Sequence, residues 1–183
     1  MTEIIAWDKA LFLFLNNLGT PAYDNFWKMV SGTLVWLPFY ATLLYLFFKA
    51  YGWRNLVYIL IFIALGITIS DQLSGIFKNG LERLRPCHDA SLNAMMRKVV
   101  CGGQYGFYSA HASNSFFLAI FSTILLRTKH FFLPWIMFIW AALVAYSRIY
   151  LGVHFPLDIL YGAGVGFLLG GFMASLAKKT LKV

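Results

Sequence analysis

The chain carries little charge. Aspartate, glutamate, lysine and arginine make up only 12% of its 183 residues, about half the share found in soluble domains. Acidic residues are the scarcer kind, with 7 against 15 basic ones, whereas hydrophobic residues make up 60% of the chain. This balance argues against an ordinary soluble domain and for a membrane protein, and the length suits a single domain over residues 1–183.

Cysteine is also scarce, since only Cys87 and Cys101 are present. Two cysteines at this spacing do not suggest a metal site, and we expect neither a metal nor another cofactor. The first apolar stretch lacks a preceding basic segment, so no cleavable signal peptide is expected. In a membrane protein, a net charge of +8 points to cytoplasmic anchoring and anionic lipid or phosphate ligands rather than to nucleic acid.

Long uncharged stretches are abundant. Met29–Phe48 and Ile159–Ala177 contain no charged residue, and each is close to the roughly 20 apolar residues that a helix needs to cross a bilayer. We therefore predict an all-α, polytopic membrane helix bundle with about five transmembrane helices, within residues 25–178. The predicted spans are Phe26–Phe48, Asn55–Phe77, Ser109–Leu126, Phe131–Tyr150 and Phe155–Ala177.

Residues 1–24 precede this bundle and are predicted to form an interfacial helix and a linker. The apolar stretch Ile4–Asn17 is too short to span a bilayer, and it contains Asp8 and Lys9. A helix lying in the membrane interface accommodates such a pattern. A sixth, irregular span is the alternative.

Proline and glycine predict further details of the spans. Pro38 lies inside the first span and is expected to kink it, whereas Pro134 falls in the first turn of its helix, where a missing N–H costs little. The last span carries small residues four positions apart, which suit close helix packing. They are Gly162, Gly166, Gly170 and Ala174.

Charge divides the connections between spans into two sides. One side has only basic residues, and the positive-inside rule makes it cytoplasmic. These residues are Lys49, Arg54, Arg127, Lys129, Lys178, Lys179 and Lys182. The long loop over residues 79–108 lies on the other side, and so faces the periplasm or exterior, or a lumen in a eukaryote. We expect a multi-pass protein of the inner (plasma) membrane with an outward-facing site.

Three cations gather at the outer ends of the spans. Lys78, Arg85 and Arg148 would repel one another unless an anion lay between them. Arginine holds phosphate oxygens with a bidentate fork, and lysine adds a point charge. The third span begins near Ser109, whose hydroxyl and neighbouring free N–H groups also suit an anion. This pattern predicts a phosphate site built without a metal.

Two histidines supply the chemistry. His154 and Asp158 are four residues apart and are expected to share a helix face, so that the carboxylate fixes the histidine tautomer. His154 then suits a nucleophile that forms a phosphohistidine. His111, on another helix, suits the acid that protonates the leaving oxygen and the base that later activates water.

These residues fall in three short motifs, Lys78–Pro86, Tyr108–His111 and Ser147–Asp158. They resemble the three signatures of the type 2 phosphatidic acid phosphatase (PAP2) family, whose core is similar to vanadium haloperoxidases. The first motif matches as lysine, six residues and Arg-Pro. The third matches as Ser-Arg, five residues, histidine, three residues and aspartate. The second is usually Pro-Ser-Gly-His, so Tyr108 and Ala110 depart from it; we expect Tyr108 to shape the substrate entrance.

The resemblance covers about Trp53–Ala177 and implies a metal-independent lipid phosphatase. It gives the same roles as the residues themselves. His154 is the nucleophile, Asp158 its partner and His111 the general acid. Lys78, Arg85, Ser109 and Arg148 hold the phosphate.

Other polar residues near the motifs are given structural roles. Asp71 either tunes Lys78 or is a structural partner inside the bundle, and we favour the second role. Glu82 and Arg83 are interpreted as solvated loop charges. We hypothesise that Cys87 and Cys101 form a disulfide, which would stabilise the loop by about 3 kcal/mol.

The substrate is predicted only by class, a membrane lipid phosphate at the headgroup level of the bilayer. The best guesses are undecaprenyl diphosphate and a phospholipid phosphate, either phosphatidic acid or phosphatidylglycerol phosphate. The alternatives are a lipid A phosphatase and a lipid phosphotransferase on the same scaffold. A non-catalytic lipid-binding protein is disfavoured, since every catalytic position is occupied. The sequence leaves the oligomeric state open.

Overall fold

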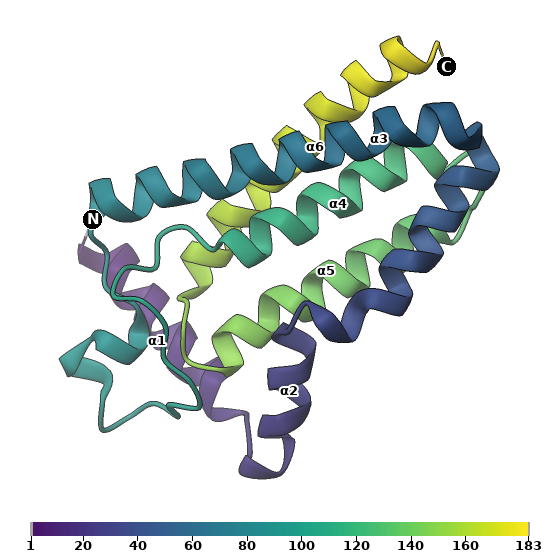
Figure 1. The fold of residues 1–183 in the computed structure, drawn as a ribbon. Coiled ribbons are helices and arrows are strands. Elements are labelled where there is room, and N and C mark those ends of the chain that lie inside the picture. The colour runs from purple at the N-terminus through teal and green to yellow at the C-terminus, as the bar shows by residue number, and fades with distance from the viewer. Residues whose placement is uncertain (1, 183) are drawn as a thin grey trace.

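The computed structural model describes residues 2–182, in which the regular elements are all helices (Figure 1). This confirms the predicted all-α membrane bundle. The α-helices are α1 (Thr2–Asn17), α2 (Asp24–Ser31), α3 (Leu37–Leu81), α4 (Ala110–Leu126), α5 (Leu133–Tyr150) and α6 (Pro156–Leu181). Short 3-10 turns are η1 (Pro21–Tyr23), η2 (Leu34–Trp36), η3 (Pro86–His88) and η4 (Ala90–Leu92).

The long helix α3 is bent sharply at Gly52. This residue has φ 75° and ψ 172°, a backbone conformation that residues with a Cβ rarely adopt. The chain reverses there, and Figure 1 shows the two arms of α3 as a hairpin at the end of the molecule away from α1. The arms, residues 37–51 and 53–81, join α4, α5 and α6 to give five apolar helical segments, as predicted.

Hydropathy supports a membrane location for these segments. The stretch Leu34–Leu81 and helices α5 and α6 are each long and apolar enough to cross a bilayer. Helix α4 is a shorter apolar helix of 17 residues, about 25 Å long. The chain is therefore built as a multi-pass membrane protein.

The start of the first span was predicted wrongly. The structure ends α2 at Ser31, gives Gly32 an extended backbone, and begins α3 only at Leu37. Pro38 therefore lies in the first turn of α3, where it stabilises the start of the helix instead of kinking its middle. The sharp bend falls fourteen residues later, at Gly52. Pro134 does lie in the first turn of α5, as predicted.

Helix α4 lies at the centre of the bundle and packs against α3, α5 and α6. Its contact with α6 is the closest, because the predicted stripe of small residues faces it. A Cβ at Gly166 would lie 2.1 Å from the carbonyl oxygen of Ser113, and one at Gly170 would lie 2.7 Å from that of Phe117. The stripe therefore brings two backbones together and places the starts of α4 and α6 side by side.

Helix α1 covers the end of the bundle where α4 and α6 begin (Figure 1), which we call the α1 end. The side-chain amide of Asn16 donates to the carbonyl oxygens of Ile149 and Tyr150 at 3.1 and 3.0 Å. Phe12 packs edge-on against Phe155 with ring centroids 5.3 Å apart. The N-terminal helix is thus an integral part of the α1 end, close to the predicted site.

Candidate active site

The structure brings the three motifs together at the α1 end. Lys78 lies in the last turn of α3, His111 in the first turn of α4 and Arg148 in the last turn of α5. His154 lies just before α6, and Asp158 in its first turn. Each motif thus occupies a helix end, so residues far apart in sequence share one region of space.

His154 and Asp158 form a pair, although not on one helix face as predicted. Pro156 is the first residue of α6, so His154 precedes the helix, and the Asp158 carboxylate reaches back to it. Its Oδ2 lies 3.4 Å from His154 Nδ1 and accepts a 2.9 Å hydrogen bond from the backbone N–H of Phe155. A proton on Nδ1 leaves the lone pair of Nε2 free for an electrophile.

Both members of this pair are shielded from solvent, with His154 2% and Asp158 0% exposed. Burial lowers the pKa of His154 below its ordinary value, although the hydrogen bond that its ring donates to Asp158 opposes this effect. The imidazole is therefore neutral at neutral pH. A neutral imidazole held in one tautomer has the form that a nucleophile requires.

Lys78, Arg85 and Arg148 lie within electrostatic range of one another and of His111. Within residues 2–182, no carboxylate forms an ion pair with any of these three cations. Arg148 donates to the Ser31 hydroxyl through one terminal nitrogen, while its buried Nε has no protein partner. Burial also lowers the pKa of Arg85. Three partly buried cations with free donors make a site suited to an anion.

Ser109 caps the N-terminus of α4. Its hydroxyl accepts a hydrogen bond from the backbone N–H of Ala112 at 3.4 Å, and its own backbone N–H donates to the carbonyl oxygen of Asp158 at 3.0 Å. The residue is fully buried between α4 and α6. Ser109 thereby ties the second motif to the third.

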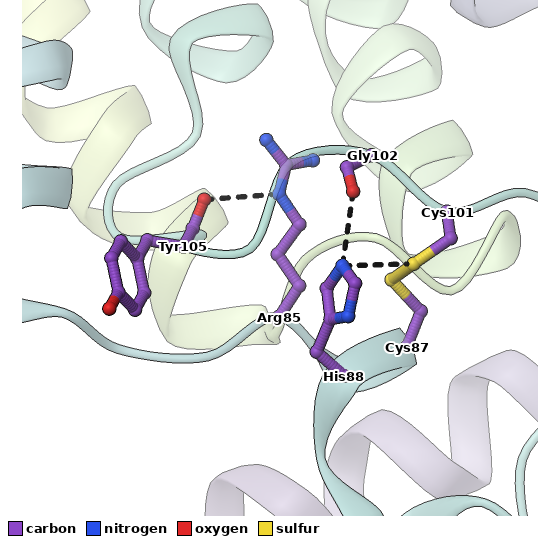
Figure 2. Close-up of a disulfide and its surroundings, with 6 residues drawn as sticks. All are labelled: Arg85, Cys87, His88, Cys101, Gly102 and Tyr105. Atoms are coloured by element: carbon purple, nitrogen blue, oxygen red, sulfur yellow. Dashed lines mark hydrogen bonds between the residues drawn. A yellow bond between two sulfur atoms is a disulfide. The ribbon is translucent and has the colours of Figure 1, made fainter.

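The loop between α3 and α4 holds Arg85 in place (Figure 2). Cys87 and Cys101 form a disulfide in the structure, with an S–S distance of 2.00 Å. Gly102, next to Cys101, packs on the guanidinium, since a Cβ there would lie 2.8 Å from an Arg85 terminal nitrogen. Arg85 also donates from Nε to the carbonyl oxygen of Tyr105 at 3.1 Å. The disulfide therefore fixes two segments that hold this arginine.

Arg83 is not the solvated loop charge that the sequence suggested. One terminal nitrogen donates to Asp158 Oδ1 at 2.7 Å, and the other donates to Asp8 Oδ2 in α1. Asp8 is itself buried, with 4% of its surface exposed. The ion pairs span 75 residues of sequence in each direction, so no local spacing could have revealed them.

Comparison with known proteins decides the family. The model of the PAP2 superfamily matches residues 55–182, more than half of the chain. The chain belongs to the PAP2 superfamily. With its apolar helices, this PAP2 protein is a membrane lipid phosphatase.

Its relatives act on different lipids. It is 37% identical over 176 residues to the lipid A 4'-phosphatase of Bacteroides thetaiotaomicron. The matched region covers 94% of this chain and 77% of that protein. It is 31% identical over 144 residues to the undecaprenyl-diphosphatase of Sulfolobus acidocaldarius. That matched region covers 78% of this chain and 62% of the relative. The PAP2-type phosphatidylglycerolphosphate phosphatase of Bacillus subtilis shares the fold, with a TM-score of 0.76 at 22% identity, over 98% of this chain and 88% of that one.

Tyr108 departs from the usual PAP2 motif, but it does not shape an entrance as we expected. Its side chain is 1% exposed and its hydroxyl donates to the carbonyl oxygen of Ser70 at 3.2 Å. Its own carbonyl oxygen accepts from the Ser74 hydroxyl at 3.1 Å. Tyr108 therefore anchors the approach to α4 on α3, which is a structural role.

A cavity of about 730 Å³ lies beside the site in this PAP2 protein. Apolar side chains of α3, α4 and α5 line most of it, and His111 opens onto it. Asp71 also lines the cavity, and it accepts a 2.9 Å hydrogen bond from the side-chain amide of Asn114. That bond gives Asp71 a structural partner on α4, although Asp71 is exposed rather than buried inside the bundle as we favoured. An apolar cavity next to a cluster of cations suits a molecule with an apolar tail and an anionic head.

Proposed function

We propose that this PAP2 protein hydrolyses the 4'-phosphate of lipid A. The relative with the higher identity and coverage is a lipid A 4'-phosphatase, which favours the alternative over our first guesses of undecaprenyl diphosphate and phospholipid phosphates. Lipid A joins several acyl chains to a phosphorylated sugar headgroup. Such a substrate fits a phosphate site beside an apolar cavity.

One observation carries the proposal. Within residues 2–182, the cations Lys78, Arg85 and Arg148 form no ion pair with a carboxylate, and they lie near His111, which lines an apolar cavity. Uncompensated buried charge is costly, and a bound phosphate removes that cost. The same three cations stabilise the charge that develops on the phosphoryl oxygens during transfer. The buried N-terminus of α4 at Ser109 adds its dipole.

Phosphoryl transfer proceeds in two steps. In the first, Nε2 of His154 attacks phosphorus, a P–N bond forms, and the P–O bond to the sugar breaks. His111 gives its proton to the departing sugar oxygen, so the lipid leaves as an alcohol. Asp158 accepts the hydrogen bond from Nδ1 and stabilises the positive charge that develops on the His154 ring.

In the second step water replaces the lipid. His111, now neutral, takes a proton from water while the water oxygen attacks phosphorus and the P–N bond breaks. Inorganic phosphate leaves, and both histidines return to their starting states. A lipid alcohol in place of water would make the protein a phosphotransferase, and analysis of products with an added lipid acceptor tests that alternative.

The site faces outwards in this proposal. The opposite end of the bundle holds the Gly52 turn, the link between α4 and α5, and the C-terminal lysines, and the positive-inside rule makes that end cytoplasmic. The α1 end then faces the periplasm of an inner membrane. Lipid A phosphate at the outer surface of that membrane is within reach of the cations.

Purified protein in detergent micelles tests the proposal. Phosphate release is measured from lipid A, undecaprenyl diphosphate, phosphatidic acid and phosphatidylglycerol phosphate, and fragmentation mass spectrometry locates the phosphate lost from lipid A. We expect the highest kcat/KM for lipid A, with loss at the 4' position, and no release by His154→Gln. A higher kcat/KM for undecaprenyl diphosphate would replace the lipid but keep the mechanism. Full activity of His154→Gln would overturn the mechanism itself.

A further inference from the structure

We infer that Arg83 is a positioning residue for the reaction, and that it holds Asp158 in place together with Asp8 of α1. This inference rests on the proposed roles of His154 and Asp158. The motif comparison assigns Arg85 to the phosphate but gives no part to Arg83. The structure places the two arginines in different surroundings.

The Asp158 carboxylate has each oxygen engaged. Oδ2 faces His154 Nδ1 and the backbone N–H of Phe155, while Oδ1 accepts the 2.7 Å hydrogen bond from Arg83. The side chain is 0% exposed, so no bulk water can replace a lost donor. A buried carboxylate without its cation is strongly destabilised, and it relieves this by rotating or by taking up a proton. Either change would loosen the hydrogen bond that fixes His154.

Arg83 is held equally firmly on its other side. Its second terminal nitrogen donates to Asp8 Oδ2, and its guanidinium lies 4.6 Å from the centroid of the Phe155 ring. Asp8 Oδ1 accepts a 2.9 Å hydrogen bond from the backbone N–H of Leu157 in the first turn of α6. Asp8 thus binds both Arg83 and the start of α6. A side chain that donates to two carboxylates from two separate nitrogens must be arginine, since lysine offers only a single charged nitrogen.

The network gives the N-terminal helix a part in catalysis. It runs from Asp8 in α1 through Arg83 in the loop to Asp158 and His154 at α6. Each terminal nitrogen of Arg83 donates to a carboxylate, whereas Arg85 forms no ion pair with any carboxylate of residues 2–182. We therefore expect Arg83 to orient Asp158 rather than to bind the phosphate. Its loss is expected to reduce turnover without weakening substrate binding.

Steady-state kinetics on lipid phosphate substrate test this inference. We compare the full-length protein with Arg83→Ala, Arg83→Lys and Asp8→Asn, and confirm folding by size-exclusion profile and helical content. We expect kcat of Arg83→Ala to fall about 10- to 100-fold, as when a partner that orients a reactive histidine is lost. KM should stay within about threefold. Arg83→Lys and Asp8→Asn should lie between this variant and the wild type.

Lys9→Ala is the matched control. Lys9 follows Asp8 in α1 and also ties that helix to the outer loop, through a 2.6 Å ion pair with Asp89. It does not touch the network, so its kcat should equal that of the wild type. An Arg83→Ala loss no larger than that of Lys9→Ala would overturn the inference, as would a loss confined to KM, which would place Arg83 on the phosphate.

Two further outcomes are distinguishable. If Arg83→Ala does not fold, Asp8→Asn and Arg83→Lys carry the test, and wild-type kcat in both would overturn the inference. If His154→Gln keeps its activity, the proposed mechanism fails whatever Arg83 does. Loss in His154→Gln together with wild-type kcat in the Arg83 and Asp8 variants would reject the positioning role alone.

Discussion

Gly162 of α6 lies against the backbone of Ser109 at the start of α4. A Cβ at position 162 would lie 2.5 Å from the carbonyl oxygen of Ser109, closer than a real Cβ contact. The same Ser109 donates its backbone N–H to the carbonyl oxygen of Asp158. This close approach therefore sets the distance between the helix that presents His111 and the helix that presents Asp158.

Gly162→Ala should separate these two helices. The obstructing atom belongs to the backbone and cannot rotate away, so we expect a loss of about 1–3 kcal/mol in stability and a fall in kcat. Gly164→Ala is the control, because a Cβ there meets nothing within 4 Å. Thermal unfolding in detergent and turnover of both variants check this. Equal behaviour of the two variants would contradict the close packing.

The disulfide should matter more for Arg85 than for the bundle. Replacing Cys87 and Cys101 with serine frees the segment that carries Gly102, and the chain-entropy model gives a loss of about 3 kcal/mol for such a loop. We expect KM for the lipid phosphate to rise, because Arg85, which we propose binds the phosphate, is less well held, while the helical content stays unchanged. Mass spectrometry of the unreduced wild type should show no alkylatable thiol, and two free thiols would refute the bridge.

Stability should depend on pH through His154. Burial lowers the pKa of His154 below the ordinary value of 6.5, so between the two values the unfolded chain binds a proton that the native state does not. The stability contributed by the neutral ring is therefore complete above about pH 6.5 and declines as the pH falls below it. Denaturant unfolding at pH 5 to 8 should show a steeper acid loss for the wild type than for His154→Gln. Parallel profiles would show that His154 titrates normally.

The orientation of the protein is testable by labelling. Asn93 lies exposed in the loop between α3 and α4, and Lys179 lies exposed near the end of α6 at the opposite end of the bundle. In intact cells, Asn93→Cys should react with a membrane-impermeant maleimide, while Lys179→Cys should react only after lysis. The reverse pattern would place the active site on the cytoplasmic side.

The sequence predicted which motif residues lie together better than it predicted the contacts that hold them. The spacing within each motif is local and each motif sits at a span end, so the gathering of His111, His154 and the three cations could be predicted from the chain alone. The partners of Arg83 could not, because Asp8 approaches it only after α1 has folded across the bundle. Tyr108 shows the same limit, since its hydrogen bonds are made with the distant residues Ser70 and Ser74.

The sequence predicted the number of apolar helical segments, which depends on composition, better than it predicted where each helix begins and bends. Uncharged length identified five apolar segments, but it did not separate α2 from α3, since the residues around Gly32 carry no charge, like the span that follows. Pro38 was read as a kink for the same reason, because the first turn of its helix had been placed too early. The sharp bend at Gly52 depends on its positive φ, which a lone glycine between aromatic residues does not reveal.

Trapping the covalent intermediate tests the central claim most directly. Lipid A carrying radioactive phosphate at the 4' position is mixed with a stoichiometric amount of purified protein, and the reaction is quenched in alkali within its first turnover. We predict label on the protein that survives alkali, is lost in acid and maps to the peptide containing His154, with none on His154→Gln. Two results would contradict the phosphohistidine mechanism. One is turnover by the wild type without any label appearing on the protein, and the other is label on His154→Gln.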